Sequence, residues 1–350
     1  MVGIQVVDQL DTDQWSKFVA AQPGGNIFHT PEMYQVFART RRHKPLLWAA
    51  VSDQGEIKAL HNPVQITLSG GIFYLLTTRN VNFGGILADE NTEGIQALSN
   101  VLERYNQKVS RASLFTELRN VCDACEFQDV FNKHGYYYEP HLNYFLDLER
   151  TSDEILSSFG KQTRRKIRTN MKTGAVVVRE INDREMVSVF YDIIQKTYSH
   201  ARIPLADISL FEAAFDVLMP KQMVRFSIAY VEDAPASAIV CLLYKDVMFG
   251  WYMGIDRSYG KFYPNEIIVW DAMKWGAEHG YAIMDFGGGG KPEEDSSVRD
   301  FKLKFHGDLC ELGRNRCIHA PFRRKLCEPM YEFSRKLLQL MGLISKDRVA

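Results

Sequence analysis

Lys302 and Lys304 have the residue type and the setting of a site that holds negative charge. They alternate with apolar side chains and follow a run of four glycines at 287–290, which itself follows an apolar strand pattern at 282–286. Glycine costs roughly 0.5–1 kcal/mol inside a helix or strand, so the run predicts a turn where the backbone bends or approaches another group closely. The pattern fits cations beside an anion site. Two lysines that reach solvent from an ordinary turn are the alternative.

A second group of cations lies in the middle of the chain. Five of them recur at offsets of 0, 3, 4, 7 and 11 residues, which places them on one face of a helix that stops at Gly174: Lys161, Arg164, Arg165, Arg168 and Lys172. Like charges on one helix face repel each other, so the arrangement is mildly costly unless an anion lies nearby. The pattern predicts either a helix that contacts the phosphates of a nucleotide-linked substrate or RNA, or a solvated basic face.

Several other chemistries lack their usual motifs. The tripeptide Asp285-Phe286-Gly287 has neither the His-Arg-Asp loop nor the glycine-rich loop of a kinase, and the Gly-Lys pair after it lacks the Ser or Thr of a P-loop. No H-E-x-x-H, G-x-S-x-G or G-x-G-x-x-G motif occurs, and the C-x-x-C at Cys122 and Cys125 is not repeated at zinc-site spacing. We therefore expect no metal site, no covalent nucleophile and no dinucleotide cofactor.

Length and composition favour a globular protein with two domains. At 350 residues the chain exceeds the size at which one core usually stops growing. A net charge of −1 excludes a globally basic protein, so no stable DNA binding is expected. The first residues carry acids where a signal peptide needs cations, and no run reaches the roughly 18 apolar residues that cross a bilayer. These features predict a cytoplasmic protein.

The two halves of the chain have the same expected order of elements. In the first half we expect helices at 12–21 and from residue 31, strands at 46–51, 57–67 and 72–77, a helix at 92–109, a strand at 113–118 and extended chain at 136–147. In the second half we expect a strand at 175–180, helices at 183–200 and 210–219, strands at 224–232, 236–244 and 247–252, a helix at 264–280 and a strand at 282–286. The order predicts an α/β domain with a mixed sheet, present twice.

Taken in order, the motifs of the second half resemble those of the FemAB family of peptidyltransferases. A basic helix ends at a glycine and leads into a strand, and an aromatic strand ends in Tyr252-Met253-Gly254. A proline-led helix, a Tyr-Asp-Phe-Gly-Gly-like turn at 282–288 and a Phe-Lys-x-x-Phe segment at 301–305 follow. The resemblance covers residues 15 to about 321, with its specific part in the second half, and the chain is similar to the shorter members that lack a long helical hairpin.

The resemblance implies a fold of two tandem GNAT-like domains, each with a mixed, mostly antiparallel sheet flanked by helices. We expect the first domain at residues 1–147 and the second, with the active site, at 148–319. A C-terminal helical segment at 320–350 is then free to pack back on the first domain.

The resemblance also implies transfer of an activated acyl or aminoacyl group to an amine of a cell-wall or envelope precursor. The donor would be aminoacyl-tRNA or acyl-CoA as a co-substrate, with no bound cofactor. The acceptor would be nucleotide-linked or an envelope precursor, which leaves peripheral contact with a membrane open. The GNAT pyrophosphate loop is matched only in part at 257–262, because Phe262 replaces a small residue, and this weakens the case for acyl-CoA.

The resemblance assigns roles to single residues. Lys302 corresponds to the family's functional lysine and is the expected catalytic residue, which would stabilise the oxyanion of the attacked carbonyl. Arg202 follows the helix at 183–200, where the family places an arginine that helps to hold the acceptor. Tyr252 and Tyr263 flank the expected cleft, although aromatic packing would explain them equally well. Further substrate contacts are expected from Lys304, Arg164 and Arg168.

Two other functions fit the same residues. One is an acyl-CoA-dependent GNAT N-acetyltransferase that acts on an amino sugar or polysaccharide precursor. The other is a non-catalytic protein that binds RNA or an anionic glycan through the basic helix, with salt-sensitive binding and no dependence on Lys302.

Overall fold

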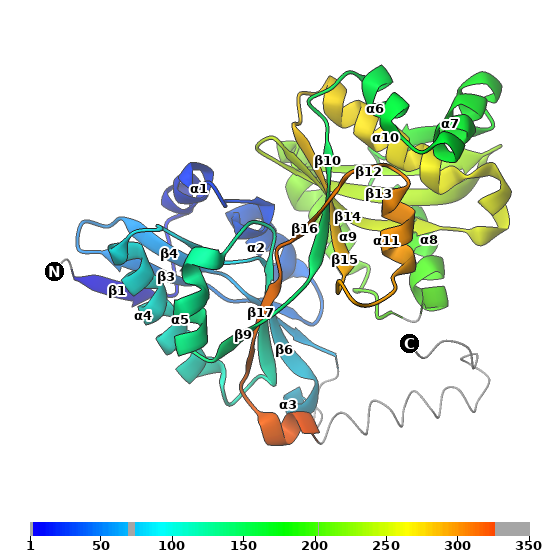
Figure 1. Ribbon diagram of the computed structural model, residues 1–350. Helices are drawn as coiled ribbons and strands as arrows, with labels where there is room; N and C mark the ends of the chain where they lie inside the picture. Colours follow the sequence, from blue (N-terminus) through cyan, green and yellow to red (C-terminus); the bar gives the residue numbers. More distant parts are fainter. Residues whose placement is uncertain (1–2, 69–73, 202, 326–350) are drawn as a thin grey trace.

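The computed structural model describes residues 3–68, 74–201 and 203–325, which form three sheets flanked by helices (Figure 1). The mixed α/β architecture expected from the sequence is confirmed. Two of the sheets lie in what we call the N-terminal half, and the third and largest lies in the C-terminal half.

The N-terminal half contains a four-stranded and a six-stranded sheet. The first has the order β1-β3-β4-β7, with bounds Ile4–Val7, Trp48–Ser52, Ile57–His61 and Leu87–Ala88. The second has the order β2-β5-β6-β8-β17-β9, with bounds His43–Pro45, Val64–Thr67, Thr78–Gly84, Phe115–Asn120, Arg314–Ile318 and Tyr136–Glu139. Helices α1 to α5 span Thr12–Ala21, Pro31–Arg39, Tyr74–Thr77, Thr92–Val109 and Gln128–Lys133.

The C-terminal half is built on one seven-stranded sheet. Its order is β11-β12-β13-β14-β15-β10-β16, with bounds Val176–Glu180, Val224–Val231, Ala234–Tyr244, Val247–Ile255, Ile283–Gly290, Leu142–Asp147 and Asp308–Glu311. Helices α6 to α11 span Ser152–Ser158, Lys161–Thr173, Met186–Ala201, Ser209–Leu218, Pro264–Glu278 and Ser297–Leu303. Helices α6, α7 and α10 share one core with the sheet, whereas α8 and α9 share another (Figure 1).

Each half contributes one strand to a sheet of the other half. Strand β10 comes from the end of the first half of the sequence, yet it lies between β15 and β16 in the seven-stranded sheet. Strand β17 comes from near the C-terminus, yet it lies between β8 and β9 in the six-stranded sheet. Figure 1 shows these strands crossing between the halves. The expected domain bounds 1–147 and 148–319 stay a prediction, because the sheets do not divide the chain at one point.

Local signals in the sequence set the ends of the main helices. The Asn91 side chain accepts a hydrogen bond from the Gly94 amide and begins α4. Gly174 ends α7 in the left-handed conformation, with φ of 63°, which glycine adopts at little cost. Pro264 occupies the first turn of α10, where its missing amide hydrogen is not needed.

Three sequence expectations for the strands were wrong. Residues 74–77, expected in a strand, form the short helix α3, and the strand begins only at Thr78. The strand expected at 57–67 is divided between β4 and β5, which belong to different sheets. The four glycines expected in a turn lie inside β15, where Gly288 and Gly290 pair with β10. A β-carbon on Gly288 would lie 3.2 Å from the His141 ring, so the glycines allow close approach within the sheet.

One core joins the two halves. Apolar side chains of α2 and of the 3-10 turn Ile27–His29 pack with those of α8, α9 and strands β12 to β14. Phe28 belongs to this core, and its ring lies 5.8 Å from the ring of Phe83 in β6 and 5.0 Å from the ring of Phe249 in β14. The rings fix the N-terminal sheet against the C-terminal sheet.

Two further expectations concern the ends of the chain and the membrane. Most of the C-terminal helical segment expected at 320–350 lies outside the described residues, which end at 325. Among the helices that the structure describes, none is long and apolar enough to cross a membrane.

Candidate functional site

The parallel strands β14 and β15 part in the middle of the seven-stranded sheet. They pair over only three positions, from Val247 with Ile283 to Phe249 with Asp285. Beyond that point β14 continues beside β13, with Trp251 as an extra residue in the ladder, while β15 continues beside β10. Parting strands leave backbone groups and side chains facing a gap. A ligand site is therefore expected at this gap.

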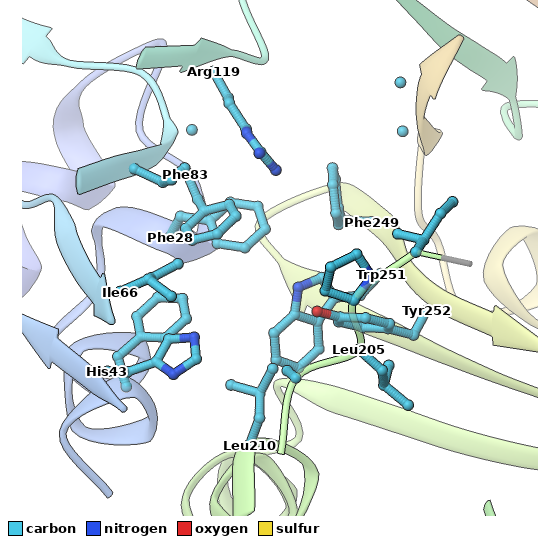
Figure 2. A pocket seen from close by; sticks show the side chains of 18 of the residues that line it. Phe28, His43, Ile66, Phe83, Arg119, Leu205, Leu210, Phe249, Trp251 and Tyr252 are labelled. Atoms are coloured by element: carbon cyan, nitrogen blue, oxygen red, sulfur yellow. The ribbon is translucent and has the colours of Figure 1, made fainter. Parts of the chain in front are cut away.

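A cavity of about 810 Å³, the central cavity, opens at this gap and extends to the N-terminal half (Figure 2). Residues 250–252 of β14 and 286–288 of β15 line it on the C-terminal side. Residues Arg79, Val81 and Phe83, which alternate along β6 and therefore share one face, line it on the other. Its volume is that of a site for a small molecule or for part of a larger substrate.

Lys302 lies in the wall of the central cavity and is only 7% exposed. Its ammonium nitrogen donates hydrogen bonds to the carbonyl oxygens of Phe286 and Gly288, the latter at 2.9 Å. One carbonyl lies within the glycine run of β15 and the other belongs to the residue before the run, so this segment of β15 places two acceptors around the lysine. An ammonium has three N–H donors, so one remains available beyond these two bonds.

Asp285 supplies a buried carboxylate close to this lysine. It is 2% exposed and its Oδ1 accepts a hydrogen bond from the Gly287 amide at 2.8 Å, which braces the segment that holds Lys302. Burial raises the pKa of Asp285 to about 7, against the opposing effects of the Gly287 amide and Lys302. Burial likewise lowers the pKa of Lys302 to about 8, although the Asp285 charge acts to raise it. Perturbed pKa values of this kind cluster at functional sites.

Tyr252 lies in the cavity wall together with other aromatic residues. Its ring packs edge-on against Phe211 at 4.9 Å and lies 5.7 Å from the ring of Tyr198. Burial raises its pKa, so the hydroxyl stays protonated at neutral pH. Figure 2 shows it beside Trp251 in the aromatic lining of the C-terminal half. Both functions expected for Tyr252, packing and cleft lining, fit this position.

The lining of the central cavity is strongly cationic. Apart from its histidines, the charged residues among the lining are Arg41, Arg42, Arg79, Arg119, Arg314, Lys302 and Asp207. Five of the six cations belong to the N-terminal half, if Arg314 is counted with its strand β17 in the six-stranded sheet. A substrate with negative charge therefore fits the cavity better than a neutral or cationic one.

A second cavity of about 530 Å³, the basic pocket, lies between α7 and the start of α10. Arg165 and Lys166 of α7 line it with Lys261 of the adjoining 3-10 turn. Tyr263 lines it too, with the Lys166 ammonium 3.9 Å above its ring centre. The pocket combines cations with the positive end of a helix, which suits an anion.

Of the remaining residues expected at the site, three do not line the central cavity: Lys304, Arg164 and Arg168. Lys304 lines neither cavity, and its ammonium lies 3.6 Å from Glu266. Arg164 donates to the Ser157 carbonyl, and neither it nor Arg168 lines either cavity. Arg202 lies outside the described residues.

The sequence expectations missed Asp285 as a partner of the lysine and Arg119 and Arg314 as cavity residues. The tripeptide around Asp285 is a kinase motif without its accompanying loops, so it predicts no role for this carboxylate. Each of these arginines has a second charged residue two positions away in its own strand. In β8 the pair is Glu117 and Arg119, and in β17 it is Arg314 and Arg316. Charges at every second position of a strand indicate a face that is not buried in a core, and this was the available signal.

The described part of the chain contains potential metal ligands and several cysteines. No group of three or more His, Cys, Asp or Glu side chains there could hold a metal ion. The described cysteines, including Cys122 and Cys125, are free thiols.

Sequence comparisons identify a domain family in the C-terminal half. Residues 157–302 match the family described as "Acetyltransferase (GNAT) domain". Among curated proteins, "Lipid II:glycine glycyltransferase" of Staphylococcus aureus is 32% identical over 82 residues. The match covers 23% of this chain and 19% of that protein, so the chain spans about a fifth of the length of the curated relatives it matches.

Solved structures extend the likeness to both halves. FemX superposes with a TM-score of 0.69 at 15% identity, over 94% of this chain and 99% of that one. L-PGS from Bacillus licheniformis gives 0.56 at 14% identity, over 94% and 97%, and a tandem GNAT protein from the clavulanic acid biosynthesis pathway gives 0.56 at 10%, over 91% and 99%. Residues 157–302 therefore match an acetyltransferase (GNAT) domain, and the chain as a whole shares its fold with FemX and with the tandem GNAT protein.

Proposed function

We propose that this protein transfers an activated acyl or aminoacyl group to an amine of a cell-wall or envelope precursor. The observation that carries the proposal is the Lys302 ammonium, buried in the cavity wall where the strands of the GNAT domain part. The relative named as a lipid II glycyltransferase supports an aminoacyl group and a cell-wall acceptor. The reaction is assigned to the cytoplasm, on a nucleotide-linked acceptor or at the membrane surface.

In this proposal the donor carbonyl is already activated as an ester or thioester. The acceptor nitrogen forms a bond to the carbonyl carbon, the bond from that carbon to the donor oxygen or sulfur breaks, and the amine proton leaves with solvent or the departing group. The protein needs to align the two reactants and to stabilise the oxyanion between them. Lys302 supplies the charge for the oxyanion, and the aromatic lining with Tyr252 excludes water.

The basic pocket supports a donor that carries phosphates. Arg165, Lys166 and Lys261 give it a positive lining, and both aminoacyl-tRNA and acyl-CoA carry phosphates beyond the acyl group. Neither donor requires a bound cofactor. The match to an acetyltransferase domain favours, as a second candidate, an acyl-CoA-dependent N-acetyltransferase that acts on an amino sugar or polysaccharide precursor.

A donor assay tests the proposal. The protein is incubated with labelled aminoacyl-tRNA and, separately, with labelled acyl-CoA, together with an extract of nucleotide-linked and lipid-linked precursors. Transfer of label from aminoacyl-tRNA to an amine supports the main proposal, and transfer from acyl-CoA supports the second candidate. Salt-sensitive binding of RNA or glycan with no transfer from either donor would overturn both and favour a binding protein.

Lys302→Met tests the assigned role of the lysine. We expect transfer to fall by about 10²–10³, the usual result of removing one oxyanion donor, while far-UV circular dichroism stays unchanged. Lys274→Met is the matched control, because Lys274 is an exposed lysine of α10. Transfer by Lys302→Met at the rate of Lys274→Met would remove Lys302 from the mechanism.

A further inference from the structure

Arg119 and Arg314 lie directly opposite each other on neighbouring strands at the central cavity. They are register partners in the antiparallel pair β8 and β17, and both line the cavity. Like charges at opposed positions of a sheet destabilise it. Burial and the charge of Arg119 lower the pKa of Arg314 to about 10, which reflects the same repulsion.

The carboxylates around these arginines do not balance their charge. Glu117, 4% exposed, receives Arg119 Nε at 2.7 Å, Arg314 Nη1 at 3.3 Å and Arg316 Nη2 at 2.6 Å. Burial alone would raise the pKa of Glu117, but the guanidinium groups lower it to about 2. Among the ion pairs of the described residues, Glu139 takes part in one, with Arg316. Three guanidinium groups thus share two carboxylates, and one positive charge is left at the cavity wall.

Arg119 presents its unused donors to the cavity. Its Nε is fixed by Glu117, and its guanidinium lies 5.2 Å from the centre of the Phe83 ring. Neither Nη atom donates a hydrogen bond within the described part of the chain. Figure 2 shows the side chain extended into the space between Phe83 and Phe249. Two parallel N–H groups on a held guanidinium match the two oxygens of a carboxylate or phosphate.

A short chain of contacts joins this position to Lys302. Arg314 Nη2 lies 2.8 Å from Nε2 of His141, whose ring packs against Gly288. The Gly288 carbonyl in turn accepts the hydrogen bond from Lys302. Because burial and the charge of Arg314 lower the pKa of His141 to about 4, its ring is neutral at physiological pH and accepts the bond from Arg314.

We propose that Arg119, held by Glu117 and Phe83 and flanked by Arg314, is a subsite for an oxyanion of the acceptor, a carboxylate or a phosphate. This inference rests on the proposed function only in identifying the ligand as the acceptor. The oxyanion subsite itself depends on the geometry. An acceptor that fills the cavity then places its negative group on the N-terminal sheet and its amine toward Lys302. The N-terminal half selects the acceptor, and the C-terminal half carries the reacting centre.

Anion binding without turnover tests the subsite. Inorganic phosphate and, separately, propionate are titrated into the full chain while tryptophan fluorescence is followed, since Trp251 lines the cavity. We expect saturable binding of at least one anion, weakened about 10- to 100-fold in Arg119→Met, as for the loss of a bidentate hydrogen bond to a charged group. The anion that binds more tightly identifies the chemical source, a phosphate or a carboxylate.

Two further variants complete the test. Arg119→Lys keeps the charge without the paired donors, so its binding should fall between the wild type and Arg119→Met. Arg179→Met is the control, because Arg179 is an exposed strand arginine of β11. Glu117 keeps two arginines in every Arg119 variant, so the fold should survive.

No saturable binding of either anion, or equal binding by Arg119→Met and the wild type, would overturn the subsite. The titration uses neither donor nor amine. A failure of acyl transfer therefore leaves the subsite standing, and a failure of anion binding leaves the transfer reaction standing.

Discussion

The two halves each contain a pair of parallel strands at the same place in the fold, and the pairs differ in how far they stay together. In the N-terminal half β6 and β8 pair over five positions, from Asn80 with Thr116 to Gly84 with Asn120. In the C-terminal half β14 and β15 pair over three and then part around the central cavity. The same strand arrangement serves as a closed wall in one half and as an open site in the other.

The face of β6 and β8 that is turned toward Tyr105 of α4 carries buried groups that differ in charge from those beside β14 and β15. Beside β6 and β8, the hydroxyl of Tyr105 bonds to the amide of Asn80 at 2.7 Å and to the hydroxyl of Thr116 at 2.7 Å. These groups are neutral and fully buried, and they satisfy each other. Beside β14 and β15 lie a carboxylate and an ammonium, Asp285 and Lys302. Buried neutral networks stabilise a structure, whereas buried charges cost stability and are kept where chemistry needs them.

Placing a charge in the neutral network of the N-terminal half gives the largest expected effect on stability. Asn80→Asp places a carboxyl group in the N-terminal network with no cation beside it. It should lower the free energy of unfolding by roughly 3 kcal/mol at neutral pH, because the buried carboxylate is uncompensated or must take up a proton. Urea unfolding followed by circular dichroism measures the loss. The loss should shrink as pH falls toward the ordinary pKa of an aspartate, because the protonated form no longer carries the charge.

Asp285→Asn is the reciprocal change. It removes the cost of burying the carboxylate and leaves the Lys302 charge unpaired, so the two effects on stability oppose each other. We expect a change in unfolding free energy within about 1 kcal/mol but a roughly tenfold lower kcat at neutral pH, because Lys302 becomes neutral more readily. If Asp285→Asn were as destabilising as Asn80→Asp and kept full activity, the contrast between a structural and a chemical half would be lost.

The sequence predicted the elements whose signals are local. Helix α4 was expected at 92–109 and found at Thr92–Val109, because its periodic apolar residues and its asparagine cap lie within one segment. The end of α7 at Gly174 followed from one residue type. Residues 74–77 were missed because an apolar segment of this length fits a strand or a helix equally well, and its neighbours in the fold decide between them.

The site was predictable only where one segment carries it. Lys302 and the glycines belong to one motif, and the structure brings them together. Arg119 and Arg314 are 195 positions apart, and only the exchange of β17 into the N-terminal sheet makes them neighbours. A long-range strand register cannot be read from a single sequence, so neither the shared charge on Glu117 nor the cationic wall was expected.

The pH dependence of turnover gives the next largest effect and tests which form of Lys302 acts. If the ammonium stabilises the oxyanion, kcat should fall above pH about 8 by about tenfold for each pH unit. A neutral lysine acting as a base would give the opposite slope, with kcat rising through the same range. Steady-state kcat at saturating acceptor is the measurement, because it reports groups of the bound complex.

Two variants assign the slope to this lysine. Lys302→Arg cannot lose its charge in the accessible range, so whatever activity remains should show no decline near pH 8. Asp285→Asn should move the decline to lower pH, since the attractive carboxylate is gone. A decline that stays at the same pH in both variants would belong to the substrate amine or another residue.

The smallest expected effect is on the free energy of unfolding at acid pH. It concerns histidines of the N-terminal half. Burial lowers the pKa of His29 and His319 to about 4 and that of His61 to about 3. A histidine with a lowered folded pKa favours the folded state fully above its unfolded pKa of 6.5, and this stability is lost as pH falls toward 4. Acid should therefore weaken the N-terminal half first.

The variant His319→Gln measures how much of this acid-dependent loss of stability comes from His319. His319 lies 2.7 Å from the Thr116 hydroxyl at the edge of the network, and a glutamine amide can bond there without titrating. Between neutral pH and one unit below 6.5, the free energy of unfolding should fall by about 1 kcal/mol less in the variant than in the wild type. The two proteins should unfold at similar urea concentrations at neutral pH, where the ring carries no charge. An identical pH slope in both would mean that His319 does not stay neutral through burial, and that the N-terminal network tolerates charge as the C-terminal site does.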